Sequence, residues 1–303
     1  MPRSAWIVLS VAAALLFLAF AGAAFVIASS SGSEADEPET TLPIAALELP
    51  LSRDDEALLV AQRKGRVLVG LAAVPGGPVE VAVLAGETPI ASRDLLFAVD
   101  GRPAGAVSCG QACFRLDVDA FNGAHRITVN APGRFEFVLP KVPPASGREL
   151  WQKAQVEMNA LRAIRYTEQL TSGVGGEARS TFELRAPNRL AFRTAGGFRS
   201  IIIGRNRWDF RNGRWERSAF PGLRVPTYMW DGAYNPRLLG TTRYRGRPIR
   251  ILSVYDHDPI PAWFRLLVDA KGRVLVASMI APSHFMGQQF GAFNGPIVIR
   301  PPT

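Results

Sequence analysis

Histidine and cysteine are scarce in this 303-residue chain, which has three of the first and two of the second. It contains no His-x-x-x-His and no Cys-x-x-Cys pair, so a zinc site of familiar spacing is unsupported. Ser-x-x-Lys and Gly-x-Ser-x-Gly, two frequent settings of a nucleophilic serine, are also absent. Asp256, His257 and Asp258 place acid and base groups together, but neighbours on a strand point to opposite faces, which favours a polar turn. We therefore expect no catalytic residues, no enzyme activity and no cofactor.

Charged residues and proline are absent from the apolar run between Ala5 and Ala28. Its 24 residues exceed the roughly 20 that a helix needs to cross a bilayer, and Trp6 lies where an interfacial ring is favoured. Arg3 precedes the run and an acidic stretch follows it, so the positive-inside rule places the rest of the chain outside the cytoplasm. We predict an uncleaved transmembrane signal-anchor at residues 1–28, in a single pass through the cell (inner) membrane. A cleaved signal peptide is the alternative.

Residues 29–56 lack an apolar run that could form a core, and Ser, Glu and Pro dominate them as far as Pro50. We predict that they form an acidic flexible tether, which holds the rest of the chain a short distance from the membrane. No cysteine follows the apolar run, which excludes a lipid-modified cysteine at that point.

Residues 57–141 contain no segment of helical period. About seven short runs alternate apolar and polar residues, and Gly, Pro, Asn or Asp bounds each of them. Asp100-Gly101 is typical of a tight turn between two strands. This pattern predicts a small immunoglobulin-like β-sandwich.

Cys109 and Cys113 are the only cysteines, within the sequence SCGQAC. An even number of cysteines outside the cytoplasm favours a disulfide. A Cys-x-x-x-Cys spacing also occurs where two thiolates hold Cu(I), and His125 is the nearest histidine in the sequence. We predict the disulfide and keep the metal site and free thiols as alternatives.

The second half begins after a Pro-rich hinge, and we assign residues 146–303 to one domain. Ser146 and Glu149 have the spacing of a capping box, which predicts a helix that continues to about Ile164. From Tyr166 the apolar period changes to two and stays so. The chain is therefore expected to be mainly β, ending in a curved antiparallel half-barrel with one covering helix.

Several phrases of this half are collectively familiar: ELRAPNRLAFRT, IIIGRNRWDFRNGRWER and SHFMGQQFGAFNG. Together they resemble the LolA/LppX-like lipoprotein-type fold, in the form associated with bacterial copper-resistance (CopD-type) membrane proteins. The resemblance covers Arg148 to Pro302. It implies an incomplete barrel around an apolar cavity that binds acyl chains or hydrophobic molecules, or an accessory role outside the cytoplasm. LolA-type carriers are soluble and LppX-type ones are lipidated, whereas this chain has an apparent anchor and an added β-domain.

Apolar residues of the predicted half-barrel are candidates for the lining of a ligand cavity, because ligand pockets are mostly apolar with few polar groups. The alternative is that the helix and these side chains fill the interior. The candidates are Leu190, Phe192, Ile201, Ile203, Trp208, Leu252, Leu266, Val268, Val276 and Met279.

A copper site is the alternative binding function, formed by Met279, His284 and Met286. Thioether and imidazole groups are suitable ligands of Cu(I), and His284 and Met286 would share a face of one strand. Core methionines and a packed histidine explain the same residues without copper. The protein would then serve copper homeostasis, by binding the metal or a membrane partner, and a non-catalytic interaction module is the third possibility.

Charge is distributed unevenly between the two halves. Residues 1–146 carry 11 basic and 15 acidic side chains, and residues 147–303 carry 24 and 11. An Arg-rich domain outside the cytoplasm would be attracted to anionic headgroups, although genomic base composition explains the preference for Arg equally well. We expect no nucleic acid partner, because the domain is predicted to lie outside the cell and its Arg residues are scattered along strands. A lipid-like ligand and a membrane protein are the other expected partners.

Overall fold

A computed structural model describes residues 49–258 and 260–303. These residues are mainly β, with 54% strand and 7% helix, which confirms the predicted class. The predicted signal-anchor and most of the predicted tether lie outside the described residues. Within the described part, no helix is both long and apolar enough to cross a membrane. The described end of the tether range packs against the body, because Leu49 is buried, as is Ser52 within the 3-10 helix η2 (Pro50–Arg53) that follows it.

The first half forms two antiparallel sheets. The larger sheet has the order β1-β2-β3-β8-β7, with β4 paired to β3, and the smaller has the order β10-β9-β5-β6. The predicted Asp-Gly turn joins β5 to β6, with Asp100 and Gly101 both at positive φ. The elements are β1 (Leu58–Lys64), β2 (Val67–Ala73), β3 (Val79–Ala85), β4 (Thr88–Pro89), η3 (Ser92–Asp94), β5 (Leu96–Val99), β6 (Arg102–Ala104), β7 (Ala106–Gly110), β8 (Cys113–Leu116), β9 (His125–Ala131) and β10 (Gly133–Leu139).

The two sheets enclose one apolar core, as a sandwich requires. Alternate residues of β2 and β3, such as Val69 and Val81, face Ile127 and Phe135 from the smaller sheet, and all four are fully buried. A sandwich therefore exists in the region where it was predicted. Its immunoglobulin-like type and the domain boundaries stay predictions.

The second half forms one antiparallel sheet of eleven strands. Its order is β16-β15-β14-β13-β12-β11-β21-β20-β19-β18-β17, so β16 and β17 are its edges. The half-barrel curvature stays a prediction. The strands are β11 (Ala163–Thr171), β12 (Ala178–Arg185), β13 (Arg189–Thr194), β14 (Arg199–Ile203), β15 (Asn206–Arg211), β16 (Arg214–Ala219), β17 (Tyr234–Tyr244), β18 (Arg247–Asp256), β19 (Ala262–Val268), β20 (Val274–Ala281) and β21 (His284–Gly291).

One helix, α2 (Arg148–Asn159), precedes this sheet, and its start and end correct the sequence analysis. Its N-cap is Gly147, without a side-chain cap, and Ser146 Oγ accepts only a long bond of 3.3 Å from Arg148 N. The helix ends at Asn159 rather than near Ile164. Ile164 instead pairs with Leu184 across β11 and β12, because a buried strand position offers it a cross-strand partner.

Side chains alternate between two faces of the large sheet, which we call the inner and the outer face. The inner face carries Tyr166 and Glu168 of β11, and the outer face carries Thr167 and Gln169. Helix α2 lies on the inner side: the hydroxyl of Tyr228 donates to the carbonyl oxygen of Met158 at 3.1 Å, and the Tyr228 ring packs edge-on against Phe290, an inner-face residue of β21. The inner face therefore holds the predicted covering helix.

The outer face is covered at one end by the sheet that contains β1, β2 and β3. Trp263 of β19 packs into this sheet above Gly70, where a Cβ atom would come within 3.0 Å of the indole. Both faces of β2 are thus occupied, one by the sandwich core and one by Trp263, and every residue of β2 is buried.

Two polar side chains of β17 hold the chain that leads into β1. Asn235 donates to the carbonyl oxygens of Ser52 at 3.1 Å and Asp54 at 2.7 Å. Arg237 donates to the carbonyl oxygen of Asp55 at 2.9 Å. Both side chains are buried, so they satisfy backbone carbonyls that would otherwise lose water without compensation.

Candidate functional site

A row of aromatic rings crosses the inner face of the large sheet. Phe290 of β21, Tyr166 of β11, Phe182 of β12 and Phe192 of β13 are successive cross-strand partners. Their neighbouring ring centroids lie 5.0, 4.7 and 5.3 Å apart, and Trp230 adds a ring 5.4 Å from Phe290. The row forms a continuous apolar layer with ring contacts at favourable separations, and its three phenylalanines are buried.

A polar row runs beside the aromatic row on the same face, two residues away along each strand. Gln288, Glu168, Ser180 and Thr194 are successive partners on β21, β11, β12 and β13. Gln288 Nε2 donates to Glu168 Oε2 at 2.7 Å. Burial raises the pKa of the Glu168 carboxyl, and the bond from Gln288 opposes that rise. The inner face therefore holds an acid whose charge is disfavoured, next to an apolar surface.

Ser200 lies at the end of the aromatic row, opposite Phe192 and opposite Asp209 of β15. It is 1% exposed, and within the described part of the chain its Oγ atom has no hydrogen-bond partner. Arg207 Nε bonds Asp209 at 2.8 Å, so this carboxylate already has a cation. A buried hydroxyl without a partner is uncommon and is suited to a polar group of a bound molecule.

The structure divides the ten predicted cavity residues between the two faces. The register places six on the inner face: Leu190, Phe192, Leu252, Leu266, Val268 and Met279. The other four, Ile201, Ile203, Trp208 and Val276, lie on the outer face.

Of the three consecutive isoleucines of β14, Ile202 is the one on the inner face, and it is 1% exposed. Ile201 and Ile203 pack with Ile297 and Ile299 of the C-terminal segment. A run of three isoleucines does not show which of them face inward, and the register places the predicted Ile201 and Ile203 on the outer face.

The predicted copper ligands come partly together. Met279 and Met286 are direct partners on β20 and β21, and both are buried. His284 shares their face, one pair further along, and its Nδ1 atom lies 2.9 Å from the carbonyl oxygen of Pro282. This places two thioethers and an imidazole on one face, and copper binding stays a prediction.

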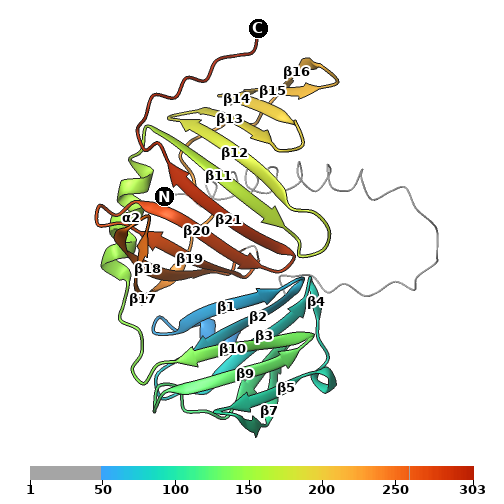
Figure 1. The fold of residues 1–303 in the computed structure, drawn as a ribbon, viewed down its shortest axis with the longest axis vertical. Coiled ribbons are helices and arrows are strands. Elements are labelled where there is room, and N and C mark those ends of the chain that lie inside the picture. The colour runs from blue at the N-terminus through green and yellow to red at the C-terminus, as the bar shows by residue number, and fades with distance from the viewer. Residues whose placement is uncertain (1–48, 259) are drawn as a thin grey trace, which may run out of the picture. The chain divides into compact units, whose positions relative to one another are not determined.

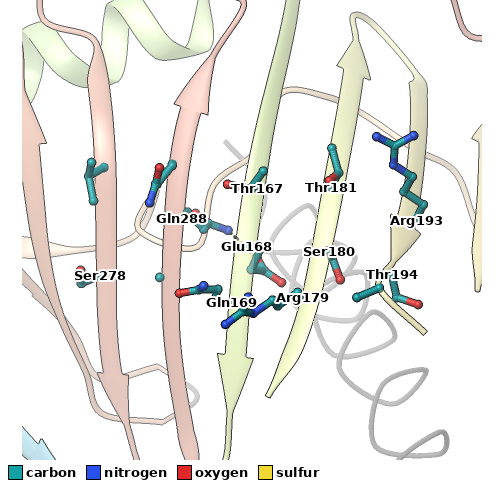
Figure 2. A pocket seen from close by; sticks show the side chains of 14 residues that line it. Thr167, Glu168, Gln169, Arg179, Ser180, Thr181, Arg193, Thr194, Ser278 and Gln288 are labelled. Carbon is teal, nitrogen blue, oxygen red and sulfur yellow. Dashed lines mark hydrogen bonds between the residues drawn. The ribbon is translucent and has the colours of Figure 1, made fainter. Parts of the chain in front are cut away.

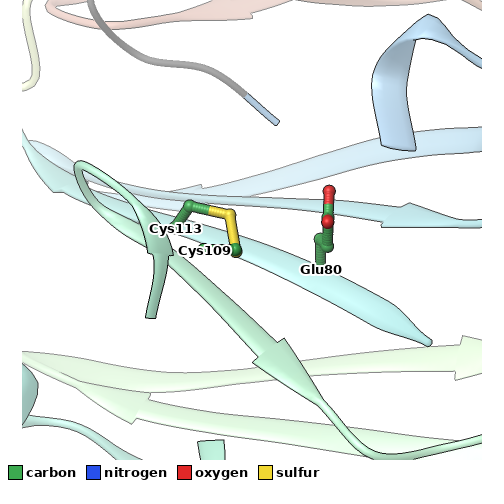
Figure 3. A group of neighbouring side chains, drawn as sticks. All are labelled: Glu80, Cys109 and Cys113. Atoms are coloured by element: carbon green, nitrogen blue, oxygen red, sulfur yellow. A yellow bond between two sulfur atoms is a disulfide. The ribbon is translucent and has the colours of Figure 1, made fainter. Parts of the chain in front are cut away.

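Cys109 and Cys113 form the predicted disulfide, and Glu80 lies beside it (Figure 3). The carboxylate of Glu80 is fully buried, and it accepts bonds from the Leu51 amide at 2.7 Å and from Arg115 at 2.5 Å. One carboxylate oxygen and both sulfur atoms lie within 4.8 Å of one another. Because the sulfur atoms are bonded to each other, this cluster holds no thiolate and acts as a structural link.

The outer face contains a polar groove of about 460 Å³ across β20, β21, β11, β12 and β13 (Figure 2). Two outer-face rows line it, together with Glu168, Ser180, Thr194 and Gln288 of the row between them. Hydroxyl, amide and guanidinium groups predominate. The residues of the two rows are Thr167, Gln169, Arg179, Thr181, Arg193, Ala195, Val276, Ser278, Gly287 and Gln289.

No site role was predicted from the sequence for Tyr166, Glu168, Phe182, Ser200 or Gln288. A signal was present for one of them. Glu168 occupies the same strand parity as Tyr166 and Leu170 in RYTEQLT, and an acid at an apolar position is typical of a functional or paired group. The other residues needed the strand register, which the sequence did not supply.

No protein-family model and no curated protein matches the chain. Among solved structures, the lipoprotein LppX of Mycobacterium tuberculosis matches 51% of this chain and 100% of its own, at 17% identity and a TM-score of 0.40. LprF of Mycobacterium bovis matches 52% of this chain and 98% of its own, at 9% identity and 0.39. A LolA superfamily protein of Nitrosomonas europaea matches 51% and 95%, at 11% identity and 0.26. These are proteins of the type that the sequence resembles, but at such TM-scores they carry no argument, and the copper-resistance association stays a prediction.

Proposed function

We propose that the protein is a membrane-anchored, extracytoplasmic binding protein that holds a lipid-like or hydrophobic molecule against the inner face of its large sheet. The observation that supports this best is the aromatic row of Phe290, Tyr166, Phe182 and Phe192, with a polar row beside it. An elongated apolar molecule fits across four strands, since each ring adds apolar contact area.

The polar groups suggest how such a molecule would be oriented. Burial raises the pKa of the Glu168 carboxyl, which favours its protonated form relative to that of an exposed glutamate, and the protonated form can donate a hydrogen bond as well as accept one. Ser200 offers a buried hydroxyl at the far end of the rings. A ligand with one hydroxyl, ester or carboxyl group would satisfy either position while its hydrocarbon part covers the rings.

Photo-crosslinking of the full chain in its native membrane tests this proposal. p-Benzoylphenylalanine would replace Phe182 or Phe192, and, as a control of similar burial, Phe97 in the sandwich core. We expect lipid-sized adducts on the peptides that carry position 182 or 192, and none at position 97. Equal labelling at all three positions, or none at any, would contradict the proposal. A copper assay of the same purified protein tests the alternative function.

Replacing Glu168 with Gln is expected to change the pH dependence of stability. Burial raises the pKa of Glu168 in the folded chain above its ordinary value of 4.5. Between pH 4.5 and that raised pKa, the folded chain therefore binds more protons than the unfolded chain. Wild-type stability therefore falls as pH rises through this window, and the Gln variant lacks that fall. Melting temperatures by circular dichroism should agree near pH 4 and favour the variant near pH 8. Glu177→Gln removes the same charge at an exposed site and is the control.

A further inference from the structure

Basic and aromatic side chains gather on the outer face of β13, β14, β15 and β16, where the sheet ends. Arg193 pairs with Arg199, Arg199 with Phe210, and Phe210 with Trp215. Trp208 and Arg217, the next pair along, share this face. We call these six residues the basic aromatic patch.

The carboxylates of these strands lie on the opposite face. Asp209 and Glu216 are partners on β15 and β16, and alternation directs both to the inner face. In the described part of the chain, no carboxylate pairs with Arg193, Arg199 or Arg217. The patch therefore carries positive charge that no carboxylate of these four strands compensates on the same face.

Guanidinium groups cover the rings of the patch. Arg199 lies 3.8 Å from the centroid of Phe210 and 5.5 Å from that of Trp215, and Arg217 lies 5.8 Å from that of Trp208. The three rings are half-buried and the three arginines are exposed. These ring contacts hold the guanidinium groups at the surface, and Arg217 also donates to Asn206 Oδ1 at 2.5 and 3.2 Å.

The polar groove continues the same surface. Arg193 belongs to both, and Thr181, Arg179 and Gln169 follow it across β12 and β11 on the outer face (Figure 2). Hydroxyl and guanidinium donors of this kind recognise phosphate oxygens. The patch and the groove thus present positive charge, interfacial rings and phosphate-binding groups on one side of the sheet.

We propose that this outer face docks on an anionic lipid surface, with the basic aromatic patch at the level of the headgroups. Trp and Arg are the side chains that suit the membrane–water interface, and arginines near it are attracted to anionic lipids. A single-stranded nucleic acid also combines charge with ring stacking, but it needs free ring faces. Here Arg199 occupies the face of Phe210, which favours the lipid surface.

Reconstitution of the full chain in nanodiscs tests the docking. Ala219, exposed on the outer face at the end of β16, would be replaced by Cys and labelled with nitrobenzoxadiazole. The quencher is a lipid that carries a spin label on its headgroup. We expect strong quenching in phosphatidylcholine discs that contain phosphatidylglycerol, and weak quenching in pure phosphatidylcholine or at high salt.

Charge reversal at Arg199 and Arg217 supplies the decisive variant. R199E/R217E should lower the ratio of docked to undocked protein by roughly tenfold or more, since each basic residue near the surface contributes appreciably. R66E/R102E makes the same change in net charge at exposed positions of the sandwich and should leave quenching unchanged. R199Q/R217Q should fall between the two, and it replaces the reversal if R199E/R217E does not fold.

Three results would overturn the proposal: quenching that is independent of phosphatidylglycerol, quenching that is equal in R199E/R217E and wild type, or an equal loss in the sandwich control. A single-stranded oligonucleotide that binds the chain in pure phosphatidylcholine discs, and is released by R199E/R217E, would assign the patch to nucleic acid instead. The crosslinking at Phe182 and Phe192 concerns the inner face, so the two proposals can fail separately.

Discussion

Replacing Asn235 with alanine is expected to lower the free energy of unfolding by about 3 kcal/mol. Its side-chain amide donates to the carbonyl oxygens of Ser52 and Asp54, and each such bond contributes about 1 kcal/mol. Asn235 also has a positive φ of 51°, which costs a residue with a Cβ and no local hydrogen bond about 1 kcal/mol more. Urea unfolding followed by Trp fluorescence measures the loss.

Two further substitutions at the same position separate the backbone from the hydrogen bonds. Asn235→Gly tolerates the positive φ and loses only the bonds, so we expect a loss of about 2 kcal/mol. Asn235→Asp keeps the shape but brings a carboxylate against two carbonyl oxygens, and it should be no more stable than the alanine variant. An aspartate variant as stable as wild type would show that these bonds do not hold the chain before β1.

Arg237 holds the same segment as Asn235, so the losses of unfolding free energy from substitutions at the two positions should not be additive. Both donate to the same short segment, residues 52–57, which leads from η2 into β1. Once Asn235 is replaced, the segment is freer to move away, and the remaining bonds from Arg237 to the carbonyl oxygens of Asp55 and Ala57 contribute less to stability. Groups that share a segment in this way commonly show interaction energies of 0.5 kcal/mol or more.

Local patterns in the sequence predicted where strands and turns lie, but they did not predict which face of a sheet each side chain occupies. Period-two alternation predicted the strands, and Asp100-Gly101 predicted a turn that the structure contains, with both residues at positive φ. The helix was predicted to begin at a Ser146 capping box and to end near Ile164, whereas its N-cap is Gly147 and it ends at Asn159, because an apolar residue after a helix suits a following strand equally well. The apolar period of a segment reflects only its local environment, whereas the residue at which a helix or strand ends also depends on the segments that pack or pair with it.

The candidate site depended on register, and register is set by contacts far apart in the sequence. The rings of the inner face come from β21, β11, β12 and β13, and Phe290 is separated from Tyr166 by most of the second half. The isoleucines of IIIG could be assigned to a face only after β13 and β14 were paired. The basic aromatic patch was invisible for the same reason, since its arginines are scattered along the chain and meet only in the sheet.

Replacing Gly70 with alanine is expected to destabilise the protein by about 2 to 3 kcal/mol. Gly70 faces the indole of Trp263, and a Cβ atom there would lie 2.9 Å from one ring carbon and 3.0 Å from another. The strand cannot move away, because the opposite face of β2 packs into the sandwich core. Overpacking at a site that is closed on both sides costs energy of this size. Chemical unfolding measures the loss, and Gly105→Ala, where a Cβ would meet nothing within 4 Å, is the control.

A double-mutant cycle with Trp263 shows whether the indole is the cause. Trp263→Leu alone should lower the free energy of unfolding by about 3 kcal/mol. It removes a buried indole whose ring centroid lies 5.2 Å from that of Tyr255. In that background Gly70→Ala should cost less than about 1 kcal/mol, because the space above Gly70 is then open. An unchanged cost would place the strain in the backbone of β2 rather than in its contact with Trp263. The absence of a side chain at Gly70 leaves the space that the Trp263 indole occupies, and this contact joins the sandwich to the large sheet.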